Sequence, residues 1–169
     1  MIKIGFFVLL SLSVFACSTS REVVSTTDKP IDITQYYCST KNGPYIGSNL
    51  NSALLYSEMR ACLIKHNYAS AAFLFSLSGT LSWYETTNNE NIESRNQHIT
   101  RLKNNLVGIP ADSLSRFWSQ VHEILGTPAR LAETCNKLST LSMDIDRQFS
   151  SNRNVSWQKA LENYLHCPS

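Results

Sequence analysis

The sequence lacks the patterns that mark most enzyme families. His122 and Glu123 begin like the helix of a zinc protease, but Gly126 stands where the second histidine ligand belongs. No G-x-S-x-G elbow is present, and Ser156 with Lys159 fits an S-x-x-K pattern without its usual S-D-N and K-T-G partners. Serine is also a favoured helix cap. We therefore expect no catalytic residue, no metal site and no cofactor. The alternative is an envelope enzyme that uses Ser156 and Lys159.

A long apolar run is also missing. The run near the N terminus, residues 4–15, has about a dozen residues, whereas a helix that crosses a membrane needs about 20. It follows the single charge of Lys3 and contains few polar residues. This pattern predicts a secretory signal peptide, residues 1–16, that is removed from the mature chain.

The end of this run, Val14-Phe15-Ala16-Cys17, resembles the lipobox of bacterial lipoproteins, in which a small residue precedes an invariant cysteine. The resemblance implies that Cys17 is acylated and becomes the first residue. Two or more acyl chains hold a protein stably at a membrane where one does so only marginally. Because Ser18 follows instead of aspartate, the family pattern favours the periplasmic face of the outer membrane. An ordinary secretory signal with a coincidental cysteine is the alternative.

Neither sign of charge dominates the chain. It has 15 Lys and Arg residues against 13 Asp and Glu residues, and removal of the signal peptide takes away only Lys3. Binding to nucleic acid calls for a clustered basic face, and electrostatic binding to anionic lipid calls for a polybasic segment. The sequence has neither. We expect no nucleic-acid partner, and a membrane association through the lipid anchor.

Four cysteines remain after Cys17, namely Cys38, Cys62, Cys135 and Cys167, and none is in a C-x-x-C pattern. In an oxidising periplasm an even count predicts two disulfides, for which three pairings exist. We favour Cys38 with Cys62 and Cys135 with Cys167, because each pair would tie neighbouring segments. A bridge over loops of this size contributes about 3 to 4 kcal/mol. A thiolate–imidazole pair of Cys62 with His66, four residues later, would require reduced Cys62.

The chain divides by composition into two parts after the signal peptide. Residues 17–35 are rich in Ser and Thr and have little apolar periodicity, which predicts a lipidated N terminus and a flexible tether. Residues 36–169 are long enough for one domain. Apolar residues recur there at helical spacing and nowhere alternate strictly. The sequence predicts an all-α fold, a compact bundle of about five to six helices held by disulfides.

The first helices are bounded by recognisable breaks. Asn67 separates one helix from the next. Thr87-Asn88-Asn89-Glu90 matches a capping box and predicts the start of a third helix. Gly108 and Pro110 end that helix. Its inward residues are expected to be Ile92, Ile99, Leu102 and Leu106.

The later helices have their own start signals. Asp112 is expected to cap a fourth helix, and Thr127-Pro128 begins a fifth that continues to the polar loop at residues 150–154. Ser156 is expected to cap the last helix. The inward face of the fourth helix would carry Leu114, Phe117, Trp118, Val121 and Leu125.

Residues 66–79, HNYASAAFLFSLSG, resemble the second half of a tetratricopeptide repeat. Tyr68, Ala71, Phe75 and Ser78 match the aromatic, alanine, aromatic and small positions of that repeat. The pattern does not recur 34 residues later. The resemblance implies one tetratricopeptide-like helical hairpin and no solenoid.

A wider stretch, CLIKHNYASAAFLFSLSGTLSWYETTNNENIESRNQHI, has the lipobox before it and two cysteines after it. It is similar to small lipoproteins encoded beside type VI secretion phospholipase effectors, which act as immunity proteins against those effectors. The resemblance covers residues 50–105 and implies a secreted phospholipase toxin as the protein partner. A non-enzymatic scaffolding or assembly lipoprotein of the envelope is the alternative.

The segment from Trp83 to His98 combines two large aromatic residues with acids and amides. Aromatic anchors with a polar rim are typical of protein interfaces. We therefore predict partner contacts at Trp83, Tyr84, Glu85, Glu90 and Glu93. A solvated turn whose aromatics face the core is the alternative. His98 and His166 are expected to lie on the solvated surface.

Overall fold

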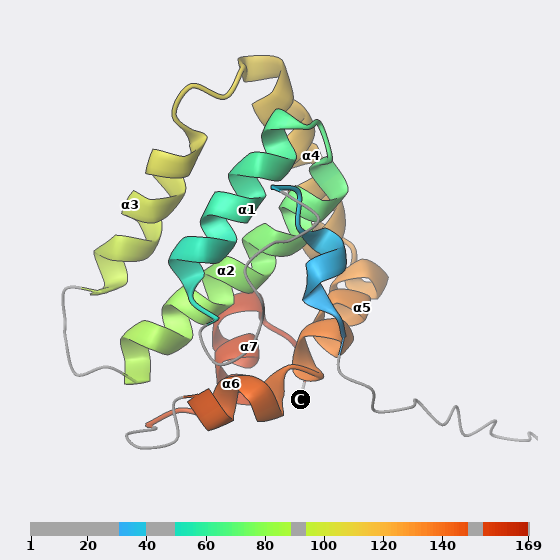
Figure 1. Ribbon diagram of the computed structural model, residues 1–169. Helices are drawn as coiled ribbons and strands as arrows, with labels where there is room; N and C mark the ends of the chain where they lie inside the picture. Colours follow the sequence, from blue (N-terminus) through green and yellow to red (C-terminus); the bar gives the residue numbers. More distant parts are fainter. Residues whose placement is uncertain (1–30, 40–49, 89–93, 149–153, 169) are drawn as a thin grey trace, which may run out of the picture.

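The computed structural model describes residues 31–39, 50–88, 94–148 and 154–168, and the described residues form an all-α fold. Seven α-helices follow a short 3-10 helix in these ranges, about six of them substantial, and the sequence prediction of the fold class is confirmed (Figure 1). The elements are η1 (Ile33–Tyr36), α1 (Ser52–Ile64), α2 (Tyr68–Asn88), α3 (Ser94–Leu106), α4 (Ala111–Gly126), α5 (Pro128–Ser139), α6 (Ser142–Gln148) and α7 (Trp157–Leu165).

Helix α2 is the centre of the bundle. It contacts α1, α3, α4, α7 and η1, and most of its residues are buried, including Leu74, Leu77 and Leu81. A helix covered on nearly every side needs no polar face, which explains why this segment is apolar or small almost throughout. None of the described helices is long and apolar enough to cross a membrane.

The hairpin of α1 and α2 begins and turns through side-chain caps. Asn51 Oδ1 accepts a hydrogen bond from Leu54 N at 2.9 Å, and Asn67 Oδ1 accepts one from Ser70 N at 3.2 Å. Between the helices His66 has φ 58°, a left-handed conformation that is uncommon outside glycine. These contacts satisfy N–H groups that a helix start leaves without an intrahelical partner.

Helix α7 lies below α2 in Figure 1 and contacts it. Trp157 is fully buried, its indole N–H donates to the Leu138 carbonyl at 2.8 Å, and its ring meets Tyr84 edge-on at 5.8 Å. Ser156 caps α7, as expected, by accepting from Lys159 N at 3.2 Å.

Both disulfides have the pairing favoured from the sequence. Cys38 is bonded to Cys62 and Cys135 to Cys167, with Cα–Cα distances of 4.9 Å and 5.7 Å. The first bridge ties the segment after η1 to α1, and the second ties α5 to the residues after α7. The alternative of a Cys62–His66 catalytic pair is therefore excluded in the oxidised protein.

Three predicted boundaries are wrong. Thr87 does not start a helix, because α2 continues through it and its hydroxyl donates to the Trp83 carbonyl at 2.8 Å. Asp112 lies inside the first turn of α4, whose N-cap is Pro110. The predicted fifth helix is two helices, α5 and α6, with a break at Thr140, whose hydroxyl donates to the Lys137 carbonyl at 2.7 Å.

The packed domain also begins earlier than expected. Ile33 is 1% exposed, and the Ile31 backbone N–H donates to Thr140 Oγ1 at 3.1 Å. The last residues assigned to the tether, 31–35, thus belong to the folded domain. The rest of the predicted tether, the signal peptide and Cys17 lie outside the described residues.

Candidate protein-binding surfaces

The end of α2 holds the first three residues predicted to contact a partner. Tyr84 is wholly buried, and its hydroxyl donates to Asp146 Oδ1 at 2.7 Å. It is a core residue, as the alternative of aromatics facing the core expects, and not an exposed partner contact. Trp83 is half-buried and packs against the core.

Glu85 has a structural role as well. Its carboxylate accepts from Ser52 N at 2.9 Å and from Ser52 Oγ at 2.5 Å, and it lies 3.3 Å from Arg101 Nη1. Its side chain is only 14% exposed. Glu85 therefore joins α2 to the first residue of α1 and to α3. The two other acids of the predicted interface, Glu90 and Glu93, lie outside the described residues.

His98 of α3 is enclosed by two tyrosines. Tyr56 Oη of α1 contacts Nδ1, and Tyr164 Oη of α7 lies 3.0 Å from Nε2. Burial and then the charge of Arg101 lower the His98 pKa, and burial raises the pKa of Tyr164 to about 12. The neutral imidazole is favoured between two protonated phenols. The expectation that His98 lies on the solvated surface is wrong.

Gly79 makes this cluster possible. A Cβ at Gly79 would overlap the ring and hydroxyl of Tyr164. The absent side chain lets Tyr164 lie directly on α2 and reach His98. Gly79 thus allows α7 to pack closely against α2 of the α1–α2 hairpin.

The serine and lysine of the S-x-x-K pattern are engaged elsewhere. Ser156 Oγ accepts from the backbone of Lys159, while Lys159 Nζ lies 2.9 Å from Glu162 Oε2. No group of His, Cys, Asp and Glu residues suited to a metal ion occurs within the described ranges.

The described residues form a groove between η1, α2, α4 and α5. We call it the α2–α5 groove; its volume is about 190 Å³. Its apolar floor includes Phe73 and Tyr36, whose rings stack with centroids 3.9 Å apart. The lining residues are Tyr36, Ala69, Ser70, Phe73, Gln120, Glu123, Ile124, Arg130, Glu133, Thr134 and Lys137.

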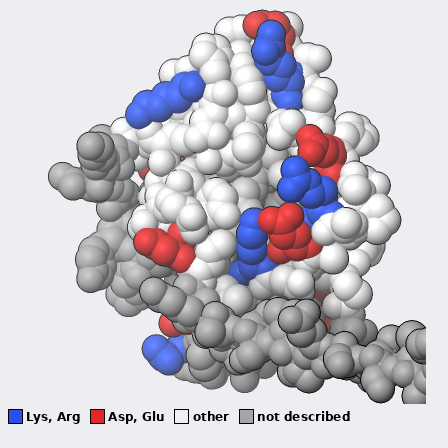
Figure 2. Space-filling model, turned by 90° about the vertical axis from the view of Figure 1, so that its right-hand side faces the viewer, with Lys and Arg blue, Asp and Glu red and all other residues white. Residues whose placement is uncertain are grey.

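The rim of the groove is a continuous chain of polar side chains. Gln120 Nε2 donates to Glu123 at 3.2 Å, Arg130 lies 3.2 Å from Glu123 and 3.4 Å from Glu133, and Lys137 lies 2.7 Å from Glu133. Acidic and basic side chains alternate on this face in Figure 2. The Lys137 hydrogen bond, followed by Arg130, lowers the pKa of Glu133. The rim charges thus balance one another.

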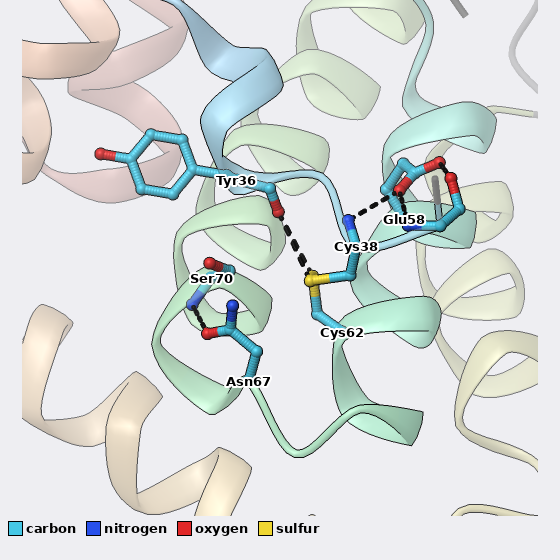
Figure 3. The surroundings of a disulfide bond; sticks show 7 residues. Tyr36, Cys38, Glu58, Cys62, Asn67 and Ser70 are labelled. Atoms are coloured by element: carbon cyan, nitrogen blue, oxygen red, sulfur yellow. Dashed lines mark hydrogen bonds between the residues drawn. A yellow bond between two sulfur atoms is a disulfide. The ribbon is translucent and has the colours of Figure 1, made fainter. Parts of the chain in front are cut away.

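Two of the four segments that line the groove, η1 and α5, lie beside disulfides or carry one. Tyr36 precedes Cys38, and Cys135 lies beside Thr134 on α5. Glu58 reinforces the first wall by accepting from the backbone N–H of Cys38 at 3.2 Å (Figure 3). The Tyr36 carbonyl oxygen lies 3.3 Å from Cys62 Sγ. This contact is not a hydrogen bond, because a disulfide sulfur carries no hydrogen.

Sequence reasoning did not identify the groove. Four elements of the chain contribute to it, and Tyr36 and Lys137 are 101 positions apart in sequence. The sequence does carry one signal for the rim of the groove. The helical spacing of Arg130, Glu133 and Lys137 predicts that their side chains pair on one face of a helix.

Apolar side chains are also exposed elsewhere. Val107 is 67% exposed, Ile64 60% and Ile99 50%. Trp118, predicted to face inward with Phe117, is 36% exposed and leans edge-on against Phe75 at 5.6 Å. Ile99 was also predicted to face inward, and that prediction is wrong. Leu102 and Leu106, predicted with it, do pack against the core, and Ile92 lies outside the described residues. Single exposed apolar residues are ordinary on protein surfaces.

Comparisons with protein-family models, with curated proteins and with solved structures found no match for this chain.

Proposed function

We propose that this protein is a lipid-anchored immunity protein that binds and neutralises a secreted phospholipase toxin of a type VI system at the periplasmic face of the outer membrane. The partner class comes from the sequence resemblance, and the anchor from Cys17. The observation that carries a protein-binding role is the α2–α5 groove.

The size of the groove favours a protein partner over a metabolite. Small-molecule sites usually enclose about 300–1,000 Å³, whereas this groove encloses about 190 Å³. Pockets that accept a single anchor side chain, surrounded by a polar rim, are typical of the energetic centres of protein interfaces. The α2–α5 groove has a polar rim and a volume suited to one side chain.

Neutralisation by binding requires high affinity. A nanomolar complex corresponds to about −12 kcal/mol, and stable complexes bury about 1,600 Å² in total. The groove would be the centre of such an interface, and the exposed surfaces of α4 and α5 around it would supply the remaining area. A phospholipase meets its lipid at the envelope, so an inhibitor anchored there would intercept it before it reaches its substrate.

The test of this function is survival in the presence of the toxin. We expect cells that lack this gene, but not the wild type, to be killed by siblings that deliver the phospholipase encoded beside it. The purified oxidised protein should bind that phospholipase and inhibit its hydrolysis of lipid vesicles. Equal survival with an active toxin, together with no binding, would favour the scaffolding alternative.

The test of location uses the signal peptide. Globomycin blocks the peptidase that processes lipoproteins, so the unprocessed precursor should accumulate, and Cys17→Ser should release the exported domain from membranes. An exported Cys17→Ser protein that stays membrane-bound would contradict the lipid anchor.

A further inference from the structure

We infer that the α2–α5 groove accepts one uncharged aromatic side chain presented by a protruding loop of the protein partner. This inference rests on the proposed binding function for its partner, but it concerns the chemistry of the groove itself. Volume, lining and charge support it independently.

The volume of the groove matches a single ring. A cavity of about 150 Å³ with an apolar lining is large enough to hold benzene, and the α2–α5 groove has about 190 Å³. It is open on one side, so the ring can arrive attached to a backbone that stays outside. A larger ligand would extend beyond the walls.

The floor of the groove offers aromatic contacts. Phe73 and Tyr36 already stack on each other there, and Ile124 and Ala69 complete the apolar lining. Aromatic rings that meet in offset or edge-on geometry attract each other beyond the gain from buried area alone. A third ring is the occupant that gains most from this floor.

The rim argues against a charged occupant. Each carboxylate of the rim is paired within the chain from Gln120 to Lys137, and both cations are paired as well. An incoming ammonium or carboxylate would have to displace an existing partner and lose its own hydration. An uncharged ring leaves the four rim charges paired with one another, and the polar rim around it excludes water from the contact.

The walls are held in position before binding. The bridges Cys38–Cys62 and Cys135–Cys167 fix the segments that carry Tyr36 and Thr134. A surface that is already ordered loses less conformational freedom when a partner docks. The groove is therefore ready for its occupant in the free protein.

The experiment measures which amino-acid side chain enters the groove of the oxidised protein. The probes are N-acetyl amides of tryptophan, phenylalanine, lysine and glutamate, titrated while NMR records the backbone amide signals. We expect the two aromatic amides to bind in the millimolar range and to shift Ser70, Phe73 and Thr134. Equal or tighter binding of the lysine or glutamate amide, or no shift with any probe, would overturn the inference.

Two alanines provide a matched pair of variants. Ala69 is the second residue of α2 and lines the groove, whereas Ala53 is the second residue of α1, and both are exposed. Ala69→Phe should fill the groove and weaken aromatic binding by about tenfold or more, while Ala53→Phe should not change it. Thermal unfolding of the two variants establishes that both remain folded. Equal binding by both would contradict the inference.

Inverting the rim tests the charge argument. The variant Glu123→Arg, Arg130→Glu, Glu133→Lys and Lys137→Glu keeps every pair but reverses its polarity. Aromatic binding should remain within about threefold, because exposed ion pairs contribute little by themselves. Loss of aromatic binding in the folded variant would show that a specific rim charge is required, against the inference.

The outcome separates the groove from the proposed function. The amide titrations contain no toxin, so they test the chemistry of the groove separately from the immunity function. If the aromatic amides bind but the neighbouring phospholipase does not, the groove inference holds and the immunity proposal fails. If the Ala69→Phe variant, whose groove is filled, still binds the phospholipase as tightly as the wild type, the immunity proposal holds and the inference fails.

Discussion

The two flanks of the α1–α2 hairpin are held in different ways. On one flank, η1 and α5 are fixed by the disulfides Cys38–Cys62 and Cys135–Cys167. On the other, α3 contains no cysteine and is attached through polar side chains, chiefly Arg101 to Glu85 and His98 to two tyrosines. Arg60 adds hydrogen bonds to the carbonyls of Asn105 and Val107, each at 2.7 Å.

Attachment by disulfides and attachment by titratable side chains differ in how they depend on pH. Bridges constrain the unfolded chain and hold the native segments together at any pH. Hydrogen bonds between titratable side chains depend on their protonation states. The disulfide flank carries the α2–α5 groove, where a fixed shape would serve the proposed binding. We expect the α3 flank, which is held by titratable side chains, to respond to acid.

Removal of one bridge should have the largest effect. Cys38→Ser with Cys62→Ser opens a loop with a sequence separation of 24, and we expect the free energy of unfolding to fall by about 3.5 kcal/mol. Urea unfolding measures the loss. Native-state hydrogen exchange should show faster exchange in η1 than in α3. If α3 loses protection first, the two flanks are coupled and the contrast between them is wrong.

Filling the space above Gly79 should have the next largest effect. Gly79→Leu forces Tyr164 off α2, and overpacking of this kind costs about 3 kcal/mol at the upper end of its usual range. Gly126→Leu is the control, because nothing lies within 4 Å of an added Cβ at Gly126. Thermal unfolding compares them. A second substitution, Tyr164→Ala, should recover part of the loss, and no recovery would mean that the clash lies elsewhere.

Local sequence signals predicted the parts of the fold that depend on neighbours in the chain. Helical periodicity identified the helices because burial of an apolar face repeats every three to four residues. The disulfide pairing followed from the expectation that each bridge ties nearby segments. Ser156 was recognised as a cap because its bond to Lys159 N is local.

Tertiary contacts decided the features that the sequence did not reveal. Thr87 matches a capping box, yet the packing of α2 carries the helix past it to Asn88, which bonds to Asn154 and Val155. The sequence left Tyr84 between a partner contact and a core position and predicted His98 at the surface, because nothing local shows that Trp157 and Tyr164 cover them. The groove was missed for the same reason, since its lining is assembled from distant segments.

Weakening the contact between α3 and the hairpin should have a smaller effect. Glu85→Gln keeps the shape of the side chain but removes the charge that faces Ser52 and Arg101. We expect a loss of about 1.5 kcal/mol, at the lower end of the range for hydrogen bonds to a charged group. Glu123→Gln is the exposed control and should cost less than about 1 kcal/mol. Chemical unfolding measures both, and equal losses would mean that burial of Glu85 adds nothing.

Acid should produce the smallest effect, and it should act on the α3 flank. Burial and Arg101 lower the His98 pKa in the folded protein, so below the ordinary value of about 6.5 the unfolded chain takes up a proton that the folded chain resists. Stability is therefore complete above that pH and falls as the pH drops toward the folded pKa. Tyr56 and Tyr164 stay protonated throughout, because burial raises the pKa of each.

Hydrogen exchange between pH 7 and pH 5, corrected for the intrinsic pH dependence, should show α3 opening more readily while the amides near the two disulfides change little. His98→Gln should remove this response, and His122→Gln, an exposed position on α4, should keep it. A response that survives His98→Gln would assign the acid sensitivity to another group and leave the two flanks alike in their dependence on pH.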